Sequence, residues 1–253
     1  LNETFWLGLG TPGSLVPADT NKYNPGPEYR TLWHTHDAAK ANQMLDAIGL
    51  NRKDAEGFRL RTDNGQRLRL EMQTQGGQFL PYTQISEMIR DQYRRIGIEI
   101  FVQENERTLA ERRNASNENQ LFAWVADGSE HLFTFPNHVF PYDPLGGGGA
   151  LYAQWFQSNG AQGKEPPPKL KEVYQLFNRA FSVPEEERIQ IGRQIWRIVT
   201  EEVFSFGVVG LSPAAMGVRI VNNRMANIPA RQYNSPDGKT PGISRPVTFY
   251  FKT

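Results

Sequence analysis

Residues 68–102 contain the string LRLEMQT (68–74), a helix-like segment at 81–96 and the string IEIFV (98–102). In the first string, apolar residues alternate with charged and amide residues, which is the period of a strand with one face inward. In the middle segment, apolar residues recur at helical spacing, and Gly97 stands where a left-handed residue commonly ends a helix. Two strands joined by such a helix form a parallel unit. We therefore expect strands 68–74 and 98–103 to be parallel neighbours, with helix 81–96 packed on one face through Ile85, Met88, Ile89 and Ile96.

A third apolar run extends from Leu121 to Ala126 and ends at Asp127, after a polar helical segment at 106–114. Ligands of open α/β sheets bind outside the carboxyl ends of the strands. Asp127 would lie at such an end, together with the residues that follow the first strand. The alternative for Asp127 is a simple turn of the chain with Gly128. The candidates at the end of the first strand are Thr74, Gln75 and Gly76.

The pattern predicts three further helices. Asp37 can cap the first, which would end at Gly49. Segments 170–181 and 185–203 follow a run of prolines, and the acidic start of 185–203 suits the positive end of a helix dipole. The residues expected to line one face of the first helix are Ala41, Met44, Leu45 and Ile48.

The remaining segments are shorter or irregular. Thr11 to Tyr29 is rich in Pro, Gly and Asn, which predicts a surface loop. Asp63-Asn64-Gly65 is a turn signal before the first strong strand. Gly146 to Gly149 lacks the ending of a phosphate loop, so a flexible hinge or loop tip is the better interpretation. Short strands are expected at 204–209, 214–222 and 247–251, and residues 5–10 are expected to form a short strand or an extended crossing segment.

Composition excludes several classes of protein. The 253 residues are 38% hydrophobic and 22% charged, with a net charge of +1, which argues against a nucleic-acid surface. The chain has no cysteine, so it has neither disulfides nor a thiolate metal site. No apolar run approaches the roughly 20 residues of a membrane span. Because the sequence begins with Leu1, we expect it to be a piece of a longer protein.

The sequence gives little support to an enzyme. It contains no Gly-x-Ser-x-Gly elbow and no thiol nucleophile. Its carboxylates cannot be paired for acid–base work from sequence alone. The histidines, at positions 34, 36, 131 and 138, lack the spacing of a zinc site. We expect no catalytic residue, no cofactor and no metal.

Several segments, taken in order, resemble the extracytoplasmic solute-binding proteins of ABC importers, family 5, the peptide/oligopeptide/nickel-binding group. They are Leu7-Gly8-Leu9-Gly10 to Val16-Pro17, Asp37 to Gly49, Asp63-Asn64-Gly65, Ile85 to Ile98, and the helical pair with Glu185 to Arg188 and Ile195-Trp196. Together they cover most of the chain.

The resemblance implies an α/β fold, a periplasmic-binding-protein type II-like lobe with a mixed, mostly parallel sheet flanked by helices. Members of the family have two lobes and about twice this length, so the chain would be the C-terminal lobe. Residues 1–36 would be an initial segment and loop from the hinge, and 37–235 the ligand-binding lobe. Residues 236–253 would be a tail that returns to the missing N-terminal lobe.

The resemblance also implies a site. Peptide-binding members carry a Trp-x-x-Asp motif whose carboxylate binds the amino group of the ligand, and Trp124-Val125-Ala126-Asp127 matches it. Trp124 and Trp155 would be aromatic walls, although a core position is as good an interpretation of Trp155. Thr74, Gln75 and Gly76 would add hydrogen bonds. The implied partners are a peptide-like or other small polar solute, the ABC permease subunits and the missing lobe, in the periplasm or on a cell-surface lipoprotein.

Two alternatives remain open at this point. A carbohydrate-active enzyme or sugar-binding module would also use aromatic residues, and an enzyme would need two carboxylates facing one pocket. An extracellular sensor domain could use the same lobe without a transporter.

Overall fold

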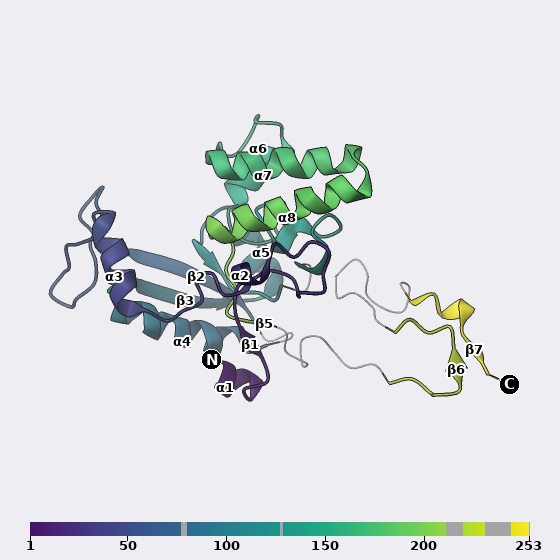
Figure 1. Cartoon of the computed structure of the whole chain (residues 1–253). Coiled ribbons are helices and arrows are strands. Elements are labelled where there is room, and N and C mark those ends of the chain that lie inside the picture. The colour runs from purple at the N-terminus through teal and green to yellow at the C-terminus, as the bar shows by residue number, and fades with distance from the viewer. Residues whose placement is uncertain (77–79, 127–128, 211–219, 231–243, 253) are drawn as a thin grey trace. The chain divides into compact units, whose positions relative to one another are not determined.

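The computed structural model describes residues 1–76, 80–126, 129–210, 220–230 and 244–252 (Figure 1). The chain divides into two compact units. The first unit comprises Leu1, Thr35–Val125 and Pro141–Glu165, and the second comprises Asn2–His34, Ala126–Phe140 and Pro166–Thr253. The three segments expected from the resemblance stay a prediction.

The first unit is built on a three-stranded parallel sheet. Its strands are β2 (Arg69–Gln75), β3 (Glu99–Asn105) and β4 (Leu121–Phe122), in the order β3-β2-β4. Met72 lies opposite Val102 on one side and Leu121 on the other. The predicted parallel pairing of the first two strands is confirmed.

Helix α4 (Tyr82–Arg95) covers one face of this sheet, as Figure 1 shows. Ile85 and Ile89 are buried there, as predicted, while Met88 and Ile96 are half-buried. Gly97 ends the helix with φ +84°, and a Cβ at this position would lie 2.9 Å from the Gly57 carbonyl oxygen. Both the backbone angle and the close approach therefore require glycine.

Helix α5 (Arg107–Ala115) contacts β2 and β3. Arg113 Nη1 donates to Gln103 Oε1 at 2.6 Å, and Gln103 alternates with the residues of β3 that face α4. The helix therefore packs on the opposite side of the sheet. Phe101 also points to this side, as predicted, and stays 44% exposed. Helix α6 (Ala150–Gln157) follows the glycine run, with Gly149 as its N-cap at φ +75°.

Helix α3 (Ala38–Ala47) begins and ends as predicted. Asp37 Oδ1 accepts from Lys40 N at 2.8 Å, and Gly49 has φ +89°. Its apolar face is largely exposed, because Met44 is 50% exposed and Ile48 69% exposed. The helix is held through polar groups instead: its Asn42 and Asp46 accept hydrogen bonds from the buried guanidinium of Arg59.

The second unit is organised around α7 (Pro168–Arg179) and α8 (Glu185–Glu201), which lie side by side (Figure 1). Both helices were predicted, but the apolar residues at their ends are not core. Phe181 is 60% exposed in the following 3-10 turn, and Val203 is 42% exposed with φ +55°. The buried residues between the helices include Leu170, Val173, Phe177, Ile195 and Trp196.

The N-terminal segment corrects two predictions. Residues 2–6 form a helix, α1 (Asn2–Trp6), and not part of a strand at 5–10. The Asn2 side chain donates to Gly10 O at 2.9 Å and accepts from Gly10 N at 3.1 Å, which folds the segment back on itself. The supposed surface loop contains β1 (Thr11–Pro12), α2 (Pro27–Arg30) and the buried side chain of Tyr23.

Few of the predicted short strands form. Of the strand predicted at 204–209, the structure has only β5 (Val209–Gly210), antiparallel to β1, and Phe206 is 50% exposed. Most of 214–222 lies outside the described residues. The tail contains β7 (Tyr250–Phe251), antiparallel to β6 (Met225–Ala226). The described 3-10 turns are Ser129–His131, Pro136–His138, Ala180–Ser182 and Pro246–Thr248.

None of the described helices combines the length and the apolar character that a membrane crossing requires.

Candidate functional site

A chain of hydroxyl and carboxyl groups joins the ends of β2 and β3 to the first turn of α4. Thr74 is fully buried, and its Oγ1 lies 2.9 Å from Thr83 Oγ1. Thr83 Oγ1 in turn donates to Glu104 Oε2. A hydroxyl has one proton, so Thr74 must be the donor to Thr83. The result is an ordered series, Thr74 to Thr83 to Glu104, that fixes an exposed carboxylate at the carboxyl edge of the sheet.

An aromatic wall stands beside β4. The rings of Trp124 and Tyr82 stack with centroids 5.1 Å apart and planes 23° apart. Phe122 extends the stack, with its centroid 6.3 Å from that of Trp124. Arg107 Cζ lies 6.0 Å from the centre of the Trp124 ring, within cation–π range. Trp124 is half-buried.

Gln75 lies on the other face of β2 from Thr74. It is 3% exposed, and its Oε1 has no hydrogen-bond partner among the described residues. Gln73 Nε2 and Asn105 Nδ2 are also buried without partners there. Gln75 lies opposite Asn105 in the sheet register. The unpaired acceptor Gln75 Oε1 and the unpaired donor Asn105 Nδ2 therefore belong to neighbouring residues at the carboxyl end of β2 and β3. Unpaired buried amide groups are costly and call for water or another polar group.

Gly76 brings the backbone out of the sheet at the same edge. Its N–H donates to Asn105 O at 3.3 Å, which extends the β2–β3 pairing by one residue. A Cβ at Gly76 would lie 3.3 Å from Glu104 Oε1, so a larger residue would press on the carboxylate. Asp127 itself lies outside the described residues, and its role stays a prediction.

Trp155 belongs to α6, away from these strands in sequence. Its carbonyl oxygen accepts from Gly160 N at 2.8 Å, and a Cβ at Gly160 would lie 3.4 Å from Trp155 Nε1. The indole is thus packed on the turn that ends its own helix. Its assignment to the site stays a prediction.

The structure adds residues that the sequence interpretation missed. Tyr82 and Thr83 bring the predicted Trp124 and Thr74 to one place, the first turn of α4. The sequence predicts that this helix begins at residue 81, where a proline is favoured in the first turn, so its first-turn side chains could have been proposed as partners. Glu104 and Arg107 gave no comparable signal, because charged residues at a strand end or helix start are usually solvated.

Glu106 is the N-cap of α5, the helix whose first residue, Arg107, lies near the Trp124 ring. Its carboxylate caps α5, accepting from the backbone N–H groups of Thr108 at 2.9 Å and Leu109 at 3.4 Å. The Thr108 N–H, more than any other group, holds the pKa of Glu106 below its ordinary value of 4.5. The carboxylate therefore stays ionised at neutral pH and fixes the start of the helix that carries Arg107.

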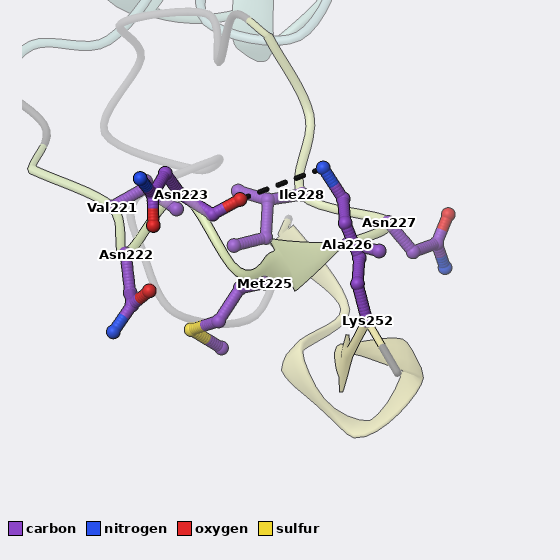
Figure 2. A pocket seen from close by; sticks show the side chains of 8 residues that line it. All are labelled: Val221, Asn222, Asn223, Met225, Ala226, Asn227, Ile228 and Lys252. Carbon is purple, nitrogen blue, oxygen red and sulfur yellow. Dashed lines mark hydrogen bonds between the residues drawn. The ribbon is translucent and has the colours of Figure 1, made fainter.

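Among the described residues, no three His, Asp or Glu side chains gather to hold a metal ion. Figure 2 shows a cavity of about 410 Å³ beside β6, where Lys252 Nζ donates to Asn223 O at 3.5 Å. Its described lining has neither an aromatic ring nor a carboxylate, so it lacks the groups that the predicted site requires. The lining residues are Val221, Asn222, Asn223, Met225, Ala226, Asn227, Ile228 and Lys252.

The first unit is thus a parallel sheet with helices on both faces and with polar groups at its carboxyl edge. The chain is similar over its whole length to a solved oligopeptide-binding protein OppA, at a TM-score of 0.75 and 21% identity, covering 41% of that chain. It is likewise similar to AppA of Bacillus subtilis in complex with a nonapeptide, at a TM-score of 0.56 and 15% identity, covering 100% of this chain and 44% of that one.

A third similar structure is a periplasmic oligopeptide-binding protein from Thermotoga maritima with bound mannohexaose. Its TM-score is 0.57 at 14% identity, with 82% of this chain and 38% of that chain covered. The chain spans about two fifths of the length of these solved structures. No protein-family model matches the sequence, and no curated protein matches it. The likeness confirms the predicted fold.

Proposed function

We propose that the chain is the C-terminal lobe of the solute-binding component of an ABC importer, and not an enzyme. The observation that carries this is the convergence of Thr74, Glu104 and Trp124 on the first turn of α4, at the carboxyl edge of the parallel sheet. Ligands of such sheets bind at this edge. A protein with this role works outside the cytoplasm and delivers its solute to permease subunits.

The solute that fits this edge best is peptide-like and carries a cationic group. Asp127, three residues beyond Trp124 in the sequence, would accept the amino group, and Glu104 supplies a carboxylate at the carboxyl edge of the sheet. The stacked rings of Trp124 and Tyr82 supply an apolar wall, which solute pockets combine with a few placed polar groups. The missing lobe would close over the solute.

The test uses the full-length protein and calorimetry with short peptides. Asp127→Asn removes the charge at nearly constant volume, and losing a charge-assisted hydrogen bond should weaken peptide binding about tenfold to a hundredfold. Asp91→Asn is the matched control, because Asp91 is an exposed residue of α4 that pairs with Arg90 and should leave affinity unchanged. Equal affinity of wild type and Asp127→Asn, with the fold intact, would remove Asp127 from the site.

An oligosaccharide is the second candidate solute. It is favoured by the half-buried Trp124 ring, since sugars stack on aromatic faces, and one protein of similar fold is solved with mannohexaose. A neutral sugar would bind independently of Asp127 but would lose affinity in Trp124→Leu. Identifying the co-purified solute by mass spectrometry separates the two candidates directly.

A further inference from the structure

The chain contains two Asn–Gly dipeptides, Asn64-Gly65 in the turn before β2 and Asn159-Gly160 after the end of α6. All four residues are exposed. An asparagine before glycine can react with its own main chain, because glycine has no Cβ to keep the following backbone nitrogen away from the side-chain carbonyl carbon. The surroundings of the two dipeptides differ in ways that favour the reaction at Asn64.

The turn that contains Asn64 is held closed by hydrogen bonds on both sides of it. Arg61 N donates to Gln66 O at 2.7 Å, which joins the two ends of the turn. The Arg61 guanidinium also pairs with the Asp63 carboxylate through two bonds, Nε to Oδ1 at 2.8 Å and Nη2 to Oδ2 at 2.5 Å. The main chain around Asn64 and Gly65 is therefore fixed in one conformation.

The carboxamide of Asn64 is folded against the peptide group of Gly65. Gln66 N donates to Asn64 Oδ1 at 2.9 Å, which is the hydrogen bond of an Asx turn. This bond brings the side-chain carbonyl back over the main chain that contains Gly65 N. The same Gln66 N–H would stabilise the negative charge that develops on Oδ1 when a nucleophile attacks Cγ.

A cation lies close to the nucleophile. A Cβ built on Gly65 would lie 3.7 Å from Arg52 Nη2, so the guanidinium adjoins this peptide group. A positive charge at this distance favours loss of the proton from Gly65 N, which must occur before the nitrogen can attack a carbonyl carbon.

The second dipeptide is arranged less favourably. Gly160 N donates to Trp155 O at 2.8 Å, whereas Gly65 N donates to Arg61 O over a longer distance of 3.1 Å. Asn159 has φ +51°, and its own N–H donates to Phe156 O at 3.2 Å. Both nitrogens of this dipeptide therefore serve the end of α6, and attack by Gly160 N would break that end.

We propose that Asn64 is a site of spontaneous covalent modification, at which its side chain forms a succinimide with Gly65. Gly65 N loses its proton to solvent and attacks Asn64 Cγ. The new N–Cγ bond replaces the bond from Cγ to the side-chain nitrogen, which leaves as ammonia. Water then adds to either carbonyl carbon of the ring and opens it, which gives aspartate or isoaspartate. Water is the only co-reactant, and nothing is oxidised or reduced.

The products change both the charge and the length of the turn. Each adds a negative charge beside Asp63. Isoaspartate also routes the main chain through the side chain of Asn64, which inserts one methylene group between Arg61 and Gln66. We expect the hydrogen bond from Arg61 N to Gln66 O to be lost in that product. This chemistry is independent of the solute that the protein binds.

The test is incubation of the whole chain at mildly alkaline pH in water enriched in heavy oxygen, followed by peptide mapping with mass spectrometry. The peptide that contains Asn64 should incorporate heavy oxygen and yield both aspartate and isoaspartate. Its reaction should be at least about fivefold faster than that of Asn159. A chain unfolded in guanidinium chloride is the reference for local sequence, and there the two rates should agree within about twofold.

Three variants test the surroundings of Asn64. Gly65→Ala should slow its reaction at least about tenfold, because a Cβ shields the nitrogen and alanine rarely adopts φ +69°. Arg52→Met should slow it about threefold and leave Asn159 unchanged. Lys53→Met is the matched control and should alter neither rate, because Lys53 Cε lies beside Gly97, 3.3 Å from the position of a Cβ there.

Three results would overturn the proposal: no labelled product at Asn64, a reaction at Asn159 that is as fast or faster in the folded chain, or the same ratio of the two rates in the folded and unfolded chains. If Gly65→Ala fails to fold, the comparison of the two dipeptides within one chain still decides the question.

Discussion

Arg59 Nη1 lies 2.6 Å from Asp46 Oδ1, although the arginine side chain is 1% exposed and the aspartate side chain 54% exposed. The guanidinium also donates through Nε to Ile96 O at 2.7 Å, through Nη1 to Leu50 O and through Nη2 to Asn42 Oδ1. One buried cation therefore joins the end of α4 to α3, and its charge is shared with a carboxylate that remains in contact with water.

We predict that Arg59→Met lowers the free energy of unfolding by about 2–4 kcal/mol, because buried carbonyl groups lose their donor. Asp46→Asn should cost about 1 kcal/mol, since the amide oxygen still accepts a hydrogen bond. Urea denaturation measures both. The control is Arg61→Met, whose exposed pair with Asp63 should matter little. An equal loss in Arg61→Met and Arg59→Met would contradict the assignment.

The packing of α4 on the sheet predicts a second mutational contrast. Ile89→Ala removes a buried side chain and should lower the free energy of unfolding by about 2–4 kcal/mol. Met44→Ala, on the exposed face of α3, should stay within about 0.5 kcal/mol of wild type. If the two variants unfold at the same urea concentration, α4 does not supply the core of the first unit.

Periodicity predicted β2, α4 and β3 because each extends over at least seven residues and has one buried face. The same reasoning failed where burial depends on distant contacts. Tyr23 lies in a stretch with loop composition, yet it packs edge-on against Phe133 and His131. The five-residue helix α1 is too short to show a period, and the hydrogen bonds of its Asn2 side chain reach Gly10, beyond the helix.

The Thr74–Thr83 pair should show coupling in a double-mutant cycle. Thr83→Val alone leaves the buried Thr74 hydroxyl without its hydrogen-bond acceptor and should lower the free energy of unfolding by about 1–3 kcal/mol. Adding Thr74→Val should then cost less than it does in the wild-type background, because neither partner is left unpaired. Thermal or urea unfolding of the four proteins gives the coupling free energy. Strict additivity would show that the hydroxyls do not interact.

The start of α5 should respond to acid. The folded-state pKa of Glu106 lies below the ordinary 4.5, so its contribution to stability is present above pH 4.5 and is lost as pH falls through the folded-state value. Carboxyl NMR titration should give the lowered pKa, and amide exchange at Thr108 should accelerate in the same pH range. Glu106→Gln removes the titrating group and should abolish that pH dependence. A Glu106 pKa at or above 4.5 would contradict the cap.

Less of the candidate site than of the fold could be predicted. The position of Thr74 and Trp124 near one sheet edge followed from parallel topology, which brings carboxyl ends together. Their partners Thr83 and Tyr82 follow only from the exact rotation of α4 over the sheet. The role of Glu104 could not be predicted either, because its hydrogen bond from Thr83 cannot be inferred from the sequence.

The order of the strands has a consequence for how the first unit forms. Met72 meets Val102, 30 residues further along the chain, but meets Leu121 only across 49 residues. Closing the longer loop costs more chain entropy, so β2, α4 and β3 can assemble before β4 joins them. Strand β4 is also only two residues long. We therefore expect the Trp124 ring to reach Tyr82 late in folding, and this wall to detach early in a local opening of the unit.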